Sequence, residues 1–183
     1  MSTGYQIYDQ KGCYYLTFQI VGWVDVFTRQ CYRDILIDAL RFSIGNKGLK
    51  VHAYVVMSNH AHLIVSARDG NLSDLVGGVK SWVARELWNR IGTGPESRRE
   101  WMQAVFRQAA AAHSRNSQYQ IWKHENHAIE LHSEAFIRQK LVYIHNNPVR
   151  AGWVHEPAHY RYSSAADYLA GKQVGALPVV FLL

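Results

Sequence analysis

Cysteines, long apolar runs and repeats are scarce or missing in this chain. Its 183 residues include two cysteines, Cys13 and Cys31, which are too few for a disulfide framework and favour a reducing compartment. No segment approaches the roughly 18 consecutive apolar residues of a membrane-spanning helix. The first residues also lack the basic start and apolar run of a signal peptide, and we find no internal repeat or low-complexity linker. These absences lead us to expect a cytoplasmic protein.

Length and composition favour one folded domain. A chain of 183 residues can bury a core without disulfides, and its 48% hydrophobic and 19% charged residues exclude disorder of the chain as a whole. We expect a single domain over residues 1–183, with a core at about 13–168 and a C-terminal arm at about 169–183 that packs on the domain or on a partner. The net charge of +6 fits nucleic-acid binding and, equally, a basic solvated surface.

The hydrophobic pattern alternates between strand-like and helix-like segments. Strands are predicted at 13–21, 50–57 and 60–67, with a fourth near 119–123 or 128–131. Helices are predicted at 29–45, 73–90 and 134–146, with Thr28, Ser73 and Ser133 as N-caps and Pro148 as the last stop. The order β-α-β-β-α-β predicts an α+β, ferredoxin-like antiparallel sheet with helices on one face. The other face is then free for a site or a partner.

The segment Asn59-His60-Ala61-His62 begins the third predicted strand. Residues two apart in a strand point to the same side, so His60 and His62 share one face of the sheet. Two imidazoles on one rigid strand make half of a metal site. A pair of this kind, taken alone, is more often two surface or hydrogen-bonded histidines, so the motif needs support from elsewhere in the chain.

A second candidate segment surrounds Tyr143 and Asn147, which are four residues apart. In a continuous helix they lie on one face, one turn from each other. A tyrosine hydroxyl can act as a nucleophile, and an asparagine oxygen is a suitable ligand for Mg²⁺ or Mn²⁺. For an isolated pair, a core aromatic residue followed by a C-terminal cap is the commoner arrangement.

Together the two segments resemble a known family. Asn59–Val65 resembles the HUH motif of the single-tyrosine transposases, and Tyr143–Val154 followed by Tyr160–Ser164 resembles their tyrosine helix and C-terminal signature. These two motif segments are most similar to those of the REP-associated tyrosine transposases and related insertion-sequence transposases. The resemblance covers most of residues 13–168 and implies the HUH endonuclease architecture.

The resemblance implies a role for four residues. His60 and His62 match the metal-ligand histidines, Tyr143 matches the nucleophile, and Asn147 matches the third-ligand position, where family members often carry glutamine. Relatives also often have proline where this chain has Ser58. The implied activity is Mg²⁺- or Mn²⁺-dependent cutting and rejoining of single-stranded DNA, with hairpins at the element ends and a 5′-phosphotyrosine intermediate.

Basic residues are candidates to hold the DNA, although each alone is more typical of a solvated surface. The predicted DNA-binding residues are Arg29, Arg33, Lys47, Lys50, Lys80, Arg138, Lys140 and Arg150, and Lys123 also lies near the tyrosine helix. Residues 96–115 are predicted to begin as a helix and continue as a basic, polar loop. The aromatic residues of this middle region suit base stacking, but we expect Trp101 and Trp122 to be in the core.

Two other functions remain open at this point. A domesticated relative would bind a DNA hairpin without cutting it, which covalent capture of DNA would distinguish. A metal-binding ferredoxin-like module unrelated to DNA would take a third histidine from His124, His127 or His132 and show no salt-dependent DNA binding. The apolar C-terminus slightly favours a homodimer.

Overall fold

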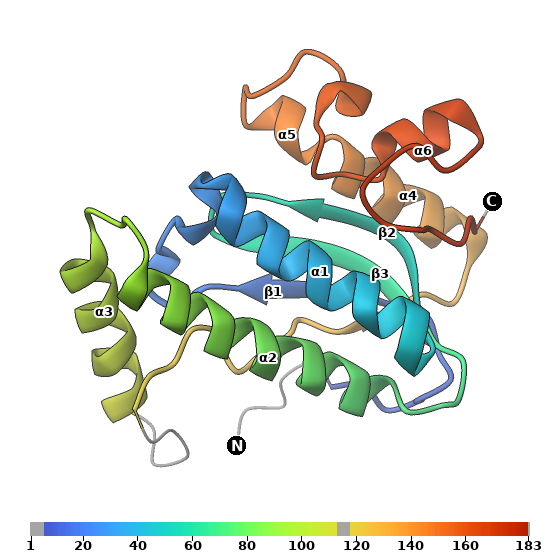
Figure 1. The fold of residues 1–183 in the computed structure, drawn as a ribbon. Helices are drawn as coiled ribbons and strands as arrows, with labels where there is room; N and C mark the ends of the chain where they lie inside the picture. Colours follow the sequence, from blue (N-terminus) through green and yellow to red (C-terminus); the bar gives the residue numbers. More distant parts are fainter. Residues whose placement is uncertain (1–5, 113–117, 183) are drawn as a thin grey trace.

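A four-stranded antiparallel sheet forms the centre of the fold (Figure 1). The computed structural model describes residues 6–112 and 118–182. The strands in it are β1 (Tyr14–Gln19), β2 (Leu49–Val56), β3 (His60–Ala67) and β4 (Ile129–Glu130). They are arranged in the order β2-β3-β1-β4, and each neighbouring pair is antiparallel. This order is that of a ferredoxin-like sheet, so the predicted fold class is confirmed.

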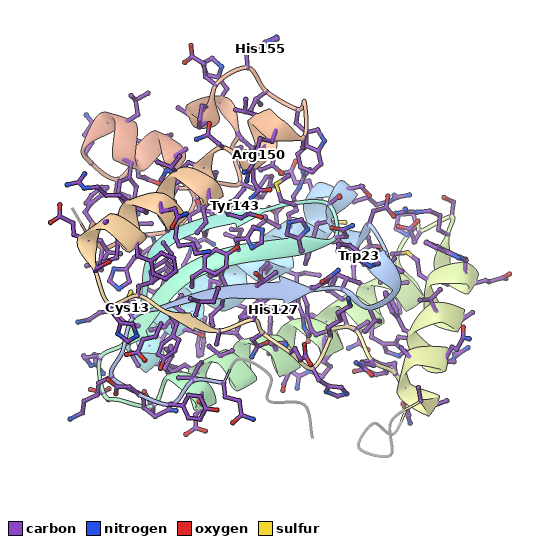
Figure 2. The ribbon with its side chains drawn as sticks, turned by 180° about the vertical axis from the view of Figure 1, so that it is seen from behind. Cys13, Trp23, His127, Tyr143, Arg150 and His155 are labelled. Atoms are coloured by element: carbon purple, nitrogen blue, oxygen red, sulfur yellow. The ribbon has the colours of Figure 1, made fainter. Side chains whose placement is uncertain are left out.

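Helices lie on both sides of this sheet. The long helices α1 (Gln30–Lys47) and α2 (Leu72–Thr93) cover one face, as predicted (Figures 1 and 2). The other face, which was expected to be free, is partly covered by α4 (Glu134–His145), which packs beside β2. The shorter helical elements are α3 (Arg99–Ala111), α5 (Asn147–Arg150), α6 (Ala165–Ala170) and the 3-10 turns η1 (Val21–Trp23), η2 (Val26–Thr28) and η3 (Pro157–His159). Among the described residues, no helix has the length and apolarity needed to cross a membrane.

Several predicted boundaries agree with the structure. The strand β3 has the predicted bounds, and the turn before it is closed by a 2.8 Å hydrogen bond from the Met57 amide to the His60 carbonyl. Ser133 caps α4 as predicted, because its hydroxyl accepts a 3.3 Å hydrogen bond from the Phe136 amide. The fourth strand lies at the later of its two predicted places, whereas residues 119–123 supply only an isolated bridge.

The predicted caps Thr28 and Ser73 are wrong. The hydroxyl of Thr28 donates to the Asp25 carbonyl within η2, and α1 begins without a side-chain cap. The helix α2 begins one residue before Ser73, whose amide donates at 2.8 Å to the side-chain oxygen of Gln10. A side chain 63 positions away therefore provides the acceptor that local sequence was expected to supply.

The expectation for Trp101 is also wrong, whereas Trp122 is in the core. Trp101 is 50% exposed because the buried face of α3 is occupied by Met102, Phe106 and Ala110. Trp122 is buried, and its indole nitrogen donates to the Lys80 carbonyl at 3.0 Å. Part of the predicted basic loop, residues 113–117, lies outside the described residues.

The C-terminal arm packs on its own chain. Leu177 is fully buried, and the Val180 amide donates to the Val51 carbonyl of β2 at 2.9 Å. The Val180 carbonyl in turn is 2.7 Å from Nδ1 of His52, which occupies a bulge in β2. The arm thereby covers part of the exposed edge of the sheet.

A buried carboxylate joins the start of α1 to the segment between α2 and α3. The side chain of Glu96 is fully buried and forms ion pairs with Arg29 at 3.0 Å and Arg98 at 3.3 Å. The Tyr32 hydroxyl donates to the same carboxylate at 3.2 Å. Burial alone would raise the pKa of Glu96, but the hydrogen bonds and charges of these arginines outweigh it and hold the pKa below its ordinary value.

Candidate active site

The two histidines of the HUH-like motif lie side by side at the start of β3. Their ring centroids are 4.7 Å apart, as expected for alternate residues on one face of a strand. This face is the one over which α4 packs, opposite α1 and α2 (Figure 2). His62 is only 6% exposed, whereas His60 is half-buried at the strand end.

Each histidine is held through its Nδ1 atom. The hydroxyl groups of Tyr15 and Thr17 on β1 lie 2.8 and 3.0 Å from Nδ1 of His62. The side-chain oxygen of Asn59 lies 2.7 Å from Nδ1 of His60. Within the described part of the chain, the side-chain hydrogen bonds of both rings are made at Nδ1. Nε2 is therefore the available ligand atom on both rings, in the arrangement typical of metal-binding histidines.

Burial keeps both imidazoles neutral. It lowers the pKa of His62 to about 3, with smaller contributions from His60, Arg150 and Lys140, and it also lowers the pKa of His60. A neutral imidazole is the form that binds a metal ion. The donor atoms and protonation state of the pair thus fit a divalent ion.

The helix α4 brings Tyr143 to the histidine pair. Leu141 and Ile144 are buried beneath the helix, which leaves Tyr143 39% exposed. The Tyr143 ring centroid is 5.4 Å from that of His62 and 6.2 Å from that of Tyr15. Residues far apart in the sequence are thereby brought into contact.

Asn147 follows Tyr143 by one turn, although the helix is interrupted between them. The helix α4 ends at His145, and Asn147 begins α5 with Pro148 in its first turn, where no amide donor is needed. The side-chain nitrogen of Asn147 donates to the Tyr143 carbonyl at 3.3 Å. Its role as third ligand stays a prediction. No cluster of three or more His, Cys, Asp or Glu able to hold a metal occurs in residues 6–112 and 118–182.

Two of the predicted DNA-binding residues lie beside Tyr143. The guanidinium of Arg150 is 4.3 Å from the centroid of the Tyr143 ring and donates to the Tyr143 carbonyl at 3.2 Å. The ammonium of Lys140 is 4.6 Å from the Tyr15 ring centroid and 5.8 Å from that of Tyr143. The pair forms a positive border to the site.

The other predicted DNA-binding residues have different surroundings. Three of them are engaged by side chains: Arg29 pairs with Glu96, Arg138 with Glu134, and Arg33 stacks on Tyr162. Lys80 is largely buried and donates to the Lys123 carbonyl at 3.0 Å. Lys47, which borders a cavity of about 550 Å³ between α1 and α2, and Lys50 at the start of β2 are exposed.

Sequence reasoning missed the residues that support the histidines. Tyr15 and Thr17 lie on the same face as His62 because β1 pairs antiparallel with β3, with Thr17 directly opposite His62. Their alternation in β1 was a possible signal, but only the register between the strands connects them to His62. Asn59 belonged to the recognised motif without an assigned role.

Comparison with known proteins places the chain in a family. A solved REP-associated tyrosine transposase bound to a REP hairpin matches with a TM-score of 0.62 at 17% identity, covering 100% of this chain and 94% of the other. A candidate transposase from Deinococcus radiodurans R1 gives 0.44 at 22% identity, covering 80% and 97%. No curated protein matches. A family model described as "Transposase IS200 like" matches residues 14–121, more than half of the chain, and the protein therefore belongs to the IS200-like transposase family.

Proposed function

We propose that this protein is a metal-dependent transposase that cuts and rejoins single-stranded DNA through a 5′-phosphotyrosine on Tyr143. The observation that carries the proposal is the 5.4 Å separation of the Tyr143 and His62 rings, in a chain of the transposase family. In this proposal His60, His62 and Asn147 hold Mg²⁺ or Mn²⁺. When bound, the ion supplies Lewis-acid polarisation of a non-bridging phosphate oxygen and helps to orient it.

Tyr143 is the better nucleophile of the two tyrosines at the site. Tyr15 is buried, its hydroxyl is engaged with His62, and burial raises the pKa of its phenol. Tyr143 is exposed enough to meet a DNA strand. This difference supports Tyr143 as the attacking group and Tyr15 as a positioning residue.

In the cleavage step, the phenolic oxygen of Tyr143 attacks the phosphorus of a phosphodiester in line. A bond forms between that oxygen and phosphorus, and the bond from phosphorus to the 3′ oxygen breaks. The phenol releases one proton, and the departing 3′ oxygen gains one as it becomes a hydroxyl. Attack of a 3′ hydroxyl on the phosphotyrosine reverses these changes, so rejoining needs no ATP.

Lys140 and Arg150 bind the DNA backbone in this proposal. Both carry positive charge beside the Tyr143 ring, where a phosphate must be placed for in-line attack. We extend to this chain the ligand named for the solved REP-associated transposase, and propose single-stranded DNA with a short hairpin as the substrate. The two free thiols, Cys13 and Cys31, suit a cytoplasmic site of action.

The nucleophile acts in the site of its own chain in this proposal. The rings of Tyr143 and His62 of the same chain lie 5.4 Å apart. A mixture of His62→Ala and Tyr143→Phe variants is therefore expected to form no covalent DNA complex. Recovery of activity in the mixture would instead establish an exchange of α4 between two copies.

Covalent capture tests the reaction. The protein is incubated with a labelled pool of hairpin DNAs with single-stranded flanks, in Mn²⁺ or with a chelator. We expect a metal-dependent protein–DNA complex that survives denaturation, is absent in Tyr143→Phe and persists in the exposed control Tyr8→Phe. Salt-sensitive binding without a covalent complex would favour a hairpin-binding protein that no longer cuts.

A further inference from the structure

Trp23 is an exposed aromatic residue at the edge of the candidate site. It ends η1, the turn that directly follows β1, and its side chain is 61% exposed. In Figure 2 it lies beyond the end of β1, with Tyr143 further along the sheet. No step of the proposed cleavage uses it.

The backbone of Trp23 has a conformation that a bulky residue rarely adopts. Its φ angle is +56°, following Gly22 at +62°. For a residue with a Cβ atom, this left-handed conformation is strained, and glycine would remove the strain. Such outliers persist when the surroundings impose them, and they concentrate at functional sites. Tryptophan at this position is therefore unfavourable for stability alone.

One side chain contacts both the Trp23 backbone and His60. The amide nitrogen of Asn59 donates to the Trp23 carbonyl at 3.4 Å, and its oxygen lies 2.7 Å from Nδ1 of His60. The backbone of Trp23 is thereby linked to the His60 imidazole through one side chain. Trp23 is therefore a neighbour of the histidine pair.

A cation accompanies the indole. The ammonium of Lys123 lies over the Trp23 ring, 5.0 Å from its centroid. The backbone of Lys123 is anchored, because its amide donates to the Gln19 carbonyl at 2.8 Å and its carbonyl accepts from the largely buried Lys80 at 3.0 Å. An exposed aromatic face next to an anchored cation is the combination that binds one base and its phosphate in single-stranded nucleic acids.

We propose that Trp23 and Lys123 form a binding site for one nucleotide of the DNA strand next to the scissile phosphate, with the base stacked on the indole and the phosphate near Lys123. The inference rests on the proposed DNA-cutting function and adds a subsite to it. The stacking is tolerant of base identity, because every base has an aromatic face. The subsite therefore holds the strand in position without reading its sequence.

Binding of a fluorescently labelled oligothymidylate tests the site, since a sequence-tolerant contact needs no knowledge of the natural hairpin. We use Tyr143→Phe as the parent protein to prevent cutting. Trp23→Ala is expected to weaken binding roughly 5- to 100-fold, and Trp23→Phe much less. The matched control is Trp82→Ala, which removes an exposed tryptophan on α2, on the opposite side of the sheet.

Salt dependence separates the two residues. Trp23→Ala should leave the slope of log affinity against log salt unchanged, because stacking releases no counterions, whereas Lys123→Gln should reduce it by about 1. Trp23→Gly should bind as weakly as Trp23→Ala yet melt no lower than the parent, which excludes unfolding as the cause.

The outcomes distinguish the two proposals. If the parent binds DNA and Trp23→Ala binds equally well, the stacking site is refuted while the transposase proposal stands. If the parent binds no single-stranded DNA at any salt concentration, the proposed function fails as well. A loss in Trp82→Ala as large as that in Trp23→Ala would also overturn the assignment of the site.

Discussion

The double support of His62 predicts a non-additive effect on metal binding. The hydroxyls of Tyr15 and Thr17 both lie within 3.0 Å of the same Nδ1 atom. Removing one with Tyr15→Phe or Thr17→Val leaves the other as partner, so each single change should cost about 0.5–1 kcal/mol, or roughly two- to fivefold in Mn²⁺ affinity. The double variant leaves a nearly buried N–H without a partner, which costs about 1–3 kcal/mol more.

Calorimetric titration of the metal-free protein with Mn²⁺ measures this effect, with all four proteins compared as a double-mutant cycle. We expect the loss in the double variant to exceed the product of the two single losses several-fold. Thermal melting without metal is the control, because both substitutions keep the shape of the side chain. A double variant that loses only the product of the single effects would refute the idea that the two hydroxyls replace each other.

Three further predictions concern stability. Glu96→Gln should lower the free energy of unfolding by about 2–3 kcal/mol in urea titrations at neutral pH. The difference in stability between the two proteins should shrink in acid, because a carboxylate with a lowered pKa stabilises the fold only while it is ionised. Burial lowers the pKa of His52, with an opposing effect from the Val180 carbonyl and a smaller lowering effect from Lys50. The stability of the protein should therefore fall as the pH drops below about 6.5, because the unfolded chain then binds a proton that the folded His52 does not. The melting temperature of His52→Gln should depend less on pH between about 7.5 and 5.5 than that of the unchanged protein. Gly22→Ala should destabilise the protein by at least about 1 kcal/mol in thermal melts, because the φ angle of Gly22 is +62°. Gly45→Ala, at an open position of α1, should stabilise the protein by about 0.5–1 kcal/mol in thermal melts.

The fold was predictable where short-range patterns determine it. The strand β3 and the cap of α4 follow from alternation and from a serine before an apolar helix, and both agree with the structure. The caps Thr28 and Ser73 failed because a neighbouring turn or a distant glutamine makes the hydrogen bonds there. Trp101 was assigned wrongly to the core, because its aromatic character does not show which face of α3 is buried.

The candidate site was predictable only as separate segments. The motif identified His60, His62 and Tyr143, but their contact depends on α4 crossing the sheet, which no local pattern encodes. The contribution of Tyr15 to the same site depends on the register of β1 against β3. That register results from the packing of both strands, so a single sequence gives no direct sign of it. The strained Trp23 is likewise visible only in the backbone.

The position of Tyr143 is set by contacts that take no part in the proposed chemistry. Two residues further along the chain, His145 lies 2.9 Å from the Ser164 hydroxyl, which also accepts a hydrogen bond from the Tyr54 amide of β2. Burial lowers the pKa of His145 to about 4, so this link is uncharged near neutral pH. The helix is thus fastened to the sheet by Leu141, Ile144 and His145, while the tyrosine is left exposed. Because these contacts do not involve its hydroxyl, Tyr143→Phe removes the proposed nucleophile without removing the framework that positions it.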